Sequence, residues 1–141
     1  MTNKMPVAIQ PSDAWLDRLT PFGAIDPGEA QIFAAAAEAG LIILSDDKRA
    51  LRVLKDVAGF PGALTGRIVV LEAILLALCE HLGPNKVRRR IQALLALDTM
   101  VQVSFSTGNP DPRNALQSYF VSLVAELDPL VLWSPPPREN V

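Results

Sequence analysis

The sequence has little cysteine, little histidine and no long uninterrupted apolar run. Its 141 residues include one cysteine, Cys79, which lies inside an apolar stretch, so no disulfide framework can be built. That stretch, residues 68–79, is interrupted by Glu72, and at about twelve residues it is shorter than the roughly twenty needed to cross a bilayer. No signal peptide is readable near Met1. The sequence therefore predicts a cytoplasmic protein without a membrane-spanning segment.

The charge is also low, with a formal net value of −2. This balance argues against nonspecific nucleic-acid binding by the whole surface, although basic residues gather in residues 48–55 and 86–90. Half of the residues are hydrophobic, which is enough for one domain with a sizeable core. We therefore expect a single domain over residues 1–133, followed by a proline-rich tail over residues 134–141.

Strand and helix patterns alternate along the chain. Helices are predicted at about residues 13–19, 27–39, 48–57, 71–82 and 113–127, with another that starts at Pro84. Strands are predicted at residues 5–10, 41–44 and 67–70. We expect residues 41–44 to be buried on both faces of a parallel sheet and joined to residues 67–70 by a helical crossover. Residues 100–105 alternate in polarity and suggest a strand, although a helix from Leu97 is an alternative.

Acidic residues gather where one predicted helix begins and where one predicted strand ends. Glu29 opens the helix 27–39, and Asp46 and Asp47 follow the strand 41–44. Such carboxylates would meet at one end of a sheet, where hard divalent cations bind. A simpler interpretation also holds for each: Glu29 would complement a helix dipole, and Asp46 and Asp47 would cap the next helix.

The stretch IDPGEAQIFAAAAEAGLIILSDDKRALRVL resembles the PIN-domain ribonucleases, including the toxins of bacterial toxin–antitoxin pairs. The resemblance implies an α/β, PIN-like fold in which a short parallel sheet is flanked by helices. It also implies a site that binds Mg²⁺ or Mn²⁺ and activates water against an RNA phosphodiester. Carried over by position, the metal ligands are Glu29 and Asp47, Asp46 is a neighbouring catalytic acid, and Ser45 is an orienting hydroxyl. Lys48 and Arg49 would lie near the phosphates, although a solvated basic face is the simpler interpretation of these two.

The sequence departs from the family at its N-terminal side. The family's first strand, which ends in a metal-binding aspartate, has no counterpart before Pro6, so we expect an N-terminally truncated domain. Two carboxylates hold Mg²⁺ only weakly, and catalysis needs fixed coordination. The sequence thus predicts an incomplete or degenerate ribonuclease. If Glu29 and Asp47 converge on one cation, their oxygens should lie roughly 4 to 6 Å apart.

A second class of function stays open, a non-catalytic interaction module. The absent strand would be central in the family's sheet, so its loss leaves an unpaired edge or an apolar groove that another chain can cover. The expected partner is a second copy of the chain or another protein, with RNA as the partner of the enzyme alternative. The candidate residues for a homodimer interface are Val7, Ile9, Trp15, Tyr119 and Phe120.

Overall fold

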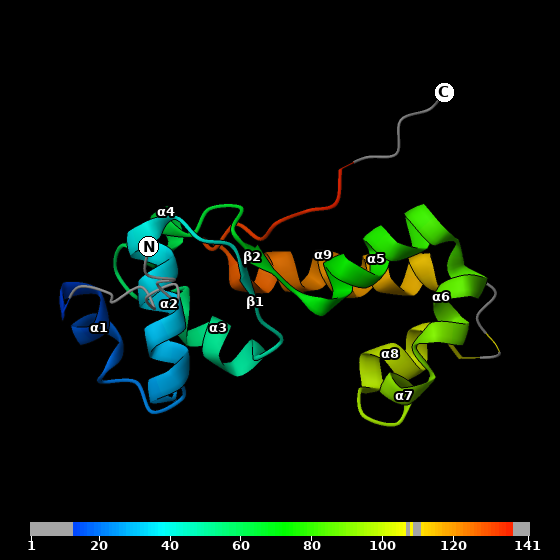
Figure 1. Cartoon of the computed structure of the whole chain (residues 1–141), viewed down its shortest axis with the longest axis horizontal. Helices are drawn as coiled ribbons and strands as arrows, with labels where there is room; N and C mark the ends of the chain where they lie inside the picture. The colour runs from blue at the N-terminus through cyan, green and yellow to red at the C-terminus, as the bar shows by residue number, and fades with distance from the viewer. Residues whose placement is uncertain (1–12, 107, 109–110, 137–141) are drawn as a thin grey trace, which may run out of the picture.

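A computed structural model shows a mostly helical protein built around a short parallel sheet (Figure 1). The structure describes residues 13–106, 108 and 111–136. In chain order the elements are α1 Asp13–Leu19, α2 Pro27–Ala39, β1 Ile43–Leu44, α3 Lys48–Leu54, α4 Phe60–Ala63, β2 Ile68–Val69, α5 Leu71–Leu82, α6 Pro84–Arg90, α7 Gln92–Leu95, α8 Thr99–Ser104 and α9 Pro112–Leu127. The coarse prediction of a small α/β fold is confirmed.

The sheet pairs β1 with β2 in parallel, as the sequence predicts for residues 41–44 and 67–70. Ile43 lies beside Ile68, and Leu44 lies beside Val69. The chain later returns to the far edge of β2, where Leu132 forms a parallel bridge with Ile68 and the backbone N–H of Trp133 donates to the Ile68 carbonyl at 2.8 Å. The described sheet therefore has β2 in its middle and β1 at one edge.

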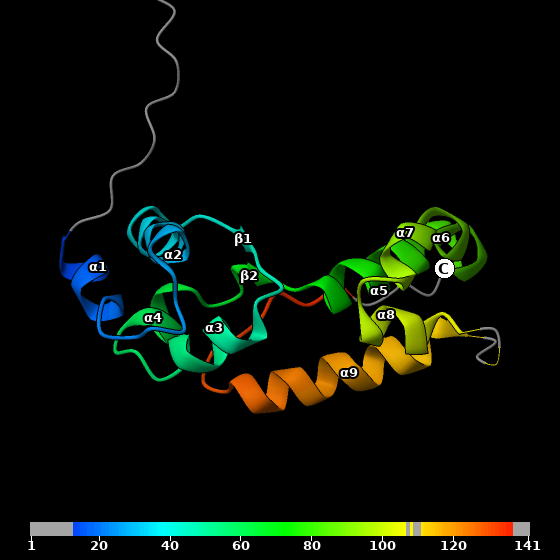
Figure 2. The same ribbon diagram turned by 90° about the horizontal axis from the view of Figure 1, so that it is seen from below.

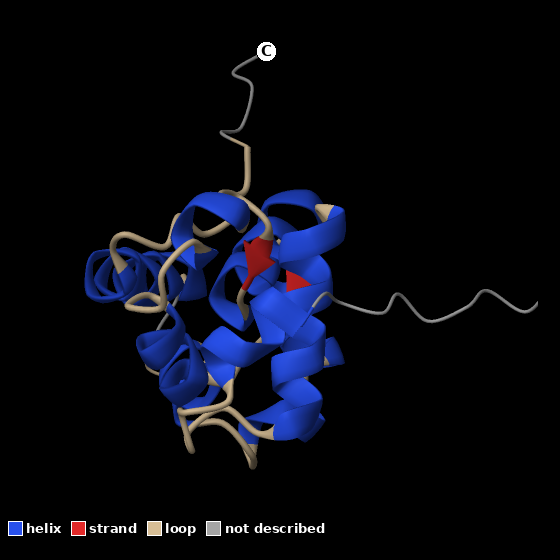
Figure 3. Ribbon diagram, turned by 90° about the vertical axis from the view of Figure 1, so that its left-hand side faces the viewer, coloured by secondary structure: helices blue, strands red, loops and turns tan. Residues whose placement is uncertain are grey.

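The helices form two groups on either side of the sheet. Helices α1 to α4 gather at one end of the molecule and α5 to α8 at the other, while α9 runs beneath both groups (Figure 2). Viewed along the long axis, helices surround much of the two strands (Figure 3). Helix α9 packs against α5, α8 and α3, and one continuous hydrophobic core joins these parts. None of the described helices is long and apolar enough to span a membrane.

Local capping explains why α2 begins and ends as the sequence predicts. Asp26 is the N-cap, Pro27 follows at the first helical position, and Gly40 ends the helix with a φ of 67°. This left-handed conformation is inexpensive for glycine because glycine has no Cβ. The predicted helix 27–39 is confirmed at both ends.

The prediction that residues 41–44 are buried on both faces is wrong. Ile43 is buried, but Ile42 is 67% exposed and Leu44 is 72% exposed. Side chains alternate across a strand, so Ile43 points into the core, and the opposite face carries Ile42 and Leu44. Among the described residues, the side chains on that opposite face over β1 are therefore largely open to solvent.

Other predicted elements also differ from the structure. Residues 100–105 do not form a strand but lie mostly in helix α8, the alternative that the sequence left open. The segment that starts at Pro84 is divided into α6 and α7. Phe120 lies on the buried side of α9, so it cannot contribute to an exposed dimer patch, whereas Tyr119 in the same helix is partly exposed. The predicted strand 5–10, with Val7 and Ile9, lies outside the described residues.

The first prediction concerns the cap of α8. Asp98 accepts a hydrogen bond from the backbone N–H of Val101 at 3.1 Å. We expect Asp98→Ala to lower the free energy of unfolding by about 1 kcal/mol, because one N–H at the start of α8 then loses its acceptor. Urea unfolding followed by circular dichroism measures this change. Asp56→Ala, at an exposed position after α3, is the control, and equal stability of the two variants would contradict the capping role.

Candidate functional site

Glu29 is fixed by a capping box at the start of α2. Its backbone N–H donates to Asp26 Oδ1 at 2.8 Å, and its side-chain Oε2 accepts from the Asp26 backbone N–H at 3.4 Å. This reciprocal pair satisfies two N–H groups that a helix start otherwise leaves without partners. Glu29 therefore takes part in the cap of α2 as well as lying in its first turn, where the sequence predicts that it complements the helix dipole, and the carboxyl group keeps further oxygen lone pairs for another contact.

Asp47 occupies the matching place at the start of α3. It is the N-cap residue, and its Oδ1 accepts a hydrogen bond from the backbone N–H of Ala50 at 3.0 Å. The backbone N–H of Arg49 also contributes a hydrogen bond to this carboxylate. Because β1 ends immediately before this segment, the sheet brings Asp47 toward the start of α2.

The structure brings the two predicted metal ligands together. The carboxyl groups of Glu29 and Asp47 hydrogen-bond each other, which raises the pKa of Glu29 and lowers the pKa of Asp47. Burial raises the pKa of Glu29 further, whereas the Ala50 N–H holds that of Asp47 down. Of the two carboxyl groups, Glu29 therefore keeps its proton to a higher pH than Asp47 does.

The acid pair borders a cleft of about 260 Å³ between α2 and β1. The cleft is lined by Glu29, Ile32, Phe33, Ile43, Leu44, Ser45, Asp46 and Asp47. Ser45 thus lines the same cleft as the pair. The walls are apolar except at the end where the acids lie.

The predicted phosphate role of Lys48 would require it to face this cleft. Lys48 is not among the residues that line it. Its ammonium lies between Asp46, with which it makes a close ion pair, and Glu72, whose Oε1 is 2.9 Å from Lys48 Nζ. Burial alone would lower the pKa of Lys48, but the hydrogen bonds to Asp46 and Glu72 outweigh it, so the pKa is raised. Lys48 is therefore a charged bridge between the ends of the two strands.

This bridge lies in a larger polar cleft of about 430 Å³ that α3, α8 and α9 enclose. The cleft is lined by Asp46, Lys48, Arg52, Glu72, Leu97, Asp98, Thr99, Met100, Tyr119, Ser122, Leu123 and Glu126. Arg52 forms an ion pair with Glu126 across its rim, and Lys55 donates to the Glu126 carbonyl. Acidic and basic side chains form ion pairs around much of the cleft, so its electrostatic potential is neither mainly positive nor mainly negative.

Glu72 is the residue of this region that sequence reasoning missed. It interrupts the apolar run 68–79, which the sequence pattern alone indicates to be part of the core. The structure places it in the first turn of α5, directly after β2, and leaves it 3% exposed. An acid inside an apolar run just after a strand was the available signal, because a buried carboxylate needs a partner.

The described residues contain no group of three or more His, Cys, Asp or Glu side chains placed to hold a metal ion. The Glu29–Asp47 pair remains as a two-carboxylate donor set. Carboxylate oxygens suit Mg²⁺, which is commonly held by one or two carboxylates together with water and substrate phosphates. The residues present therefore fit such a cation. Asp46 is not part of this donor set, because it forms an ion pair with Lys48.

Comparisons with known proteins add no relative. No family model, no curated protein and no solved structure matches this chain.

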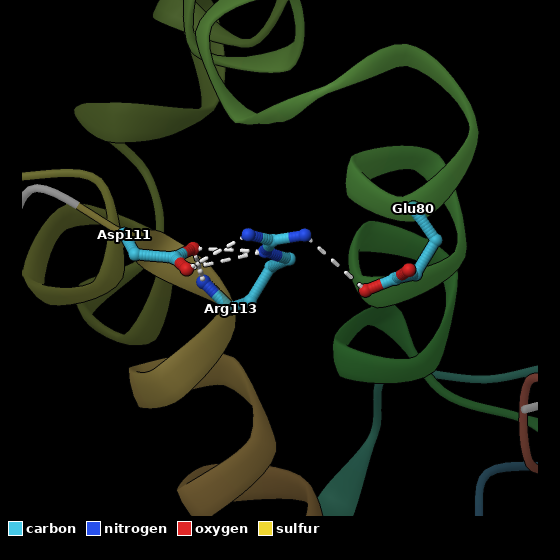
Figure 4. Close-up of polar contacts among 3 residues, drawn as sticks. All are labelled: Glu80, Asp111 and Arg113. Carbon is cyan, nitrogen blue, oxygen red and sulfur yellow. Dashed lines mark hydrogen bonds and ion pairs between the residues drawn. The ribbon is translucent and has the colours of Figure 1, made fainter. Parts of the chain in front are cut away.

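A separate polar cluster ties α5 to α9 at the other end of the molecule (Figure 4). Arg113 binds Asp111 through Nε and Nη2, and its Nη1 lies 3.6 Å from Glu80 Oε1. Hydrogen bonding to Asp111 raises the pKa of Arg113 and, reciprocally, lowers that of Asp111. Figure 4 shows the guanidinium between the two acids, which indicates a structural clamp.

Cys79 lies next to this clamp and supplies the second prediction. Burial raises the pKa of its thiol to about 11, so at pH 8 only about one molecule in a thousand carries the thiolate. We expect a disulfide reagent such as dithionitrobenzoate to react with the native protein at least a hundredfold more slowly than with the unfolded protein in urea. Equal rates in the two states would show that the thiol is accessible and reactive.

Proposed function

We propose that this protein is a PIN-related, toxin-type ribonuclease with an incomplete metal site, in which Glu29 and Asp47 would hold Mg²⁺ or Mn²⁺. The observation that supports the proposal is the contact between these two carboxyl groups, which come from separate helix starts. The bound cation would supply a water molecule activated for attack on an RNA phosphodiester. The chain's own contribution is to fix both acids by helix caps and to lower the proton affinity of Asp47.

The pair supplies fewer oxygen ligands than a hexacoordinate cation needs. An RNA phosphate and water would complete the shell, so we propose that metal and RNA bind together and that cleavage is slow. Arg49, exposed beside Asp47, is the basic residue placed to meet a phosphate, because Lys48 is engaged by Asp46 and Glu72. An ion-paired ammonium is a poor phosphate ligand unless its pairs first break.

The third prediction is a titration that tests the acid pair. We expect wild-type protein to bind Mn²⁺ with a dissociation constant on the order of 1 mM, and Asp47→Asn to weaken binding at least tenfold because one charged ligand is lost. Isothermal titration calorimetry measures both. Asp56→Asn, an exposed acid after α3, should bind like wild type. Equal binding by wild type and Asp47→Asn would leave the two acids as helix caps only.

The affinity for Mn²⁺ should also depend on pH, and the raised pKa of Glu29 sets the direction of the change. Because the pKa of Glu29 is raised, its proton stays on at a higher pH than in an isolated glutamate and competes with the cation. Binding should therefore strengthen as the pH rises through that pKa and level off above it. A fluorescent single-stranded RNA added to the same samples should bind in a Mn²⁺-dependent way, and gels should show slow cleavage that Asp47→Asn abolishes.

A second candidate function, an interaction module without catalysis, is favoured by a different observation. Leu44 of β1 and Ile42, which immediately precedes β1, expose their side chains to solvent. Sheets of parallel strands usually carry cover on both faces, so this exposed side is the natural place for a partner.

A further inference from the structure

Helix α6 carries a set of exposed basic side chains, which we call the α6 basic patch. Its members are Lys86, Arg89 and Arg90. Spacings of three and four residues place Lys86 beside both arginines on the helix surface. Val87 and Ile91 are buried, so the other side of this segment packs onto the core. The three cationic groups therefore form one solvent-facing cluster.

The α6 basic patch differs in its partners from the other basic cluster of the chain. Within residues 48–55, Lys48 is paired with Glu72, and Arg52 is paired with Glu126. In the part of the chain that the structure describes, no ion pair or side-chain hydrogen bond joins a member of the α6 basic patch to another residue. Its three charges therefore remain available to a ligand, whereas most of the first cluster is neutralised.

The acidic residues on this part of the chain are already engaged. Glu80 and Asp111 both contact Arg113, and Asp98 caps α8. Residues 79–114 contain five Lys or Arg against three Asp or Glu, although the whole chain has 13 against 15. Positive charge is thus concentrated around α6 in a protein whose net charge is negative.

Phosphate is the chemistry that such a cluster fits. Guanidinium groups bind phosphate oxygens through pairs of hydrogen bonds, and a polyanion that meets several cations at once gains further from the release of its counterions. A lipid surface is the rival polyanion, but helices that lie on membranes place apolar side chains in the bilayer. The exposed positions of α6 are all polar: Asn85, Lys86, Arg89 and Arg90.

We propose that the α6 basic patch binds the phosphate backbone of single-stranded RNA. The inference rests on the proposed function for its choice of RNA as the polyanion. Helices α2 and α6 lie at opposite ends of the molecule, so the patch holds a stretch of RNA away from the phosphate at the Glu29–Asp47 pair (Figure 1). The patch contains no aromatic side chain on which a base can stack, so it binds RNA without regard to base sequence.

Fluorescence anisotropy of a labelled oligouridine with the full chain in EDTA tests the proposal. EDTA removes divalent cations, so the acid pair contributes nothing to this binding. We expect a dissociation constant on the order of 10 to 100 µM at about 20 mM salt. The logarithm of the association constant should fall against the logarithm of salt with a slope of about −2, because each of the three phosphate contacts contributes about −0.7. An oligoadenosine of the same length should bind within about threefold.

Arg89→Gln and Arg52→Gln form a matched pair of variants, because each removes one positive charge from an exposed guanidinium. Arg89→Gln should weaken binding about five- to tenfold and reduce the salt slope to about −1.4. Arg52→Gln should bind within about twofold of wild type, because Glu126 already holds that guanidinium. The double variant Arg89→Lys/Arg90→Lys keeps both charges and should keep the slope. Circular dichroism should show that all variants remain folded.

The triple variant Lys86→Gln/Arg89→Gln/Arg90→Gln should bind at least about thirtyfold more weakly than wild type. A triple variant that binds like wild type would overturn the proposal, as would equal weakening by Arg89→Gln and Arg52→Gln. Vesicles with about 30% phosphatidylserine that bind wild type but not the triple variant, while RNA binds neither, would also overturn it in favour of a lipid surface. Patch-dependent RNA binding by a protein that never cleaves RNA would support this inference and refute the ribonuclease proposal alone.

Discussion

We expect Lys48→Met to lower the free energy of unfolding by about 3 kcal/mol. Lys48 Nζ lies 2.9 Å from Glu72 Oε1, and the Glu72 side chain is only 5% exposed. Without the ammonium, a buried carboxylate keeps its desolvation cost but loses its counter-charge. Asp46 contributes little to the loss, because its side chain is 46% exposed and water can solvate it.

Two further variants test whether this loss of stability comes from the Lys48–Glu72 ion pair. Arg49→Met, at the exposed neighbouring position, should change stability by less than about 0.5 kcal/mol. The double variant Lys48→Met/Glu72→Met should recover to within about 1 kcal/mol of wild type, because both charges leave the interior together. Urea unfolding measures all three. If Lys48→Met proves as stable as Arg49→Met, the bridge does not hold the strand ends together.

We expect Phe60→Ala to lower the free energy of unfolding by about 3 to 5 kcal/mol. Phe60 is fully buried at the start of α4, and its ring meets that of Trp15 edge-on, with centroids 4.9 Å apart and an interplanar angle of 73°. The substitution removes both the buried ring and this contact, and it leaves a cavity where α1 and α4 meet.

The chain itself offers a fluorescent reporter and control positions for the Phe60 test. Trp15 fluorescence should shift to longer wavelength as the cavity admits water. Phe22→Ala, at a ring that is 38% exposed, should cost less than about 1 kcal/mol. Phe60→Leu should fall between the two and keeps the test valid if Phe60→Ala does not fold. A loss below 1 kcal/mol for Phe60→Ala would show that the α1–α4 contact is not part of the stable core.

The parts of the fold that sequence reasoning predicted are those fixed by neighbouring residues. Asp26, Pro27 and Gly40 set both ends of α2 through contacts within a few residues of each other. The pairing of β1 with β2 also follows from local pattern, because a short helix between two apolar segments favours a parallel crossover. The proximity of Glu29 and Asp47 follows in turn from the end of that strand and the starts of those helices.

The parts that were missed depend on residues distant in the chain. The run 41–44 is continuously apolar, and nothing in it reveals that only the Ile43 side receives a cover among the described residues. Residues 100–105 alternate like a strand, but the Asp98 cap and packing against α9 make them helical. The role of Glu72 likewise depended on Lys48, which lies 24 residues earlier. Periodicity within a segment does not contain such information.

The position of Leu132 beside Ile68 has a consequence for the order of folding during synthesis. The ribosome delivers Leu132 about 64 residues after Ile68, which at roughly 5 to 20 residues per second is an interval of about 3 to 13 s. During that interval one edge of β2 has no partner, and the apolar side of α9 has not yet arrived. A nascent chain is then open to mispairing or to chaperone capture, and arrival of residues 112–133 ends this vulnerable period.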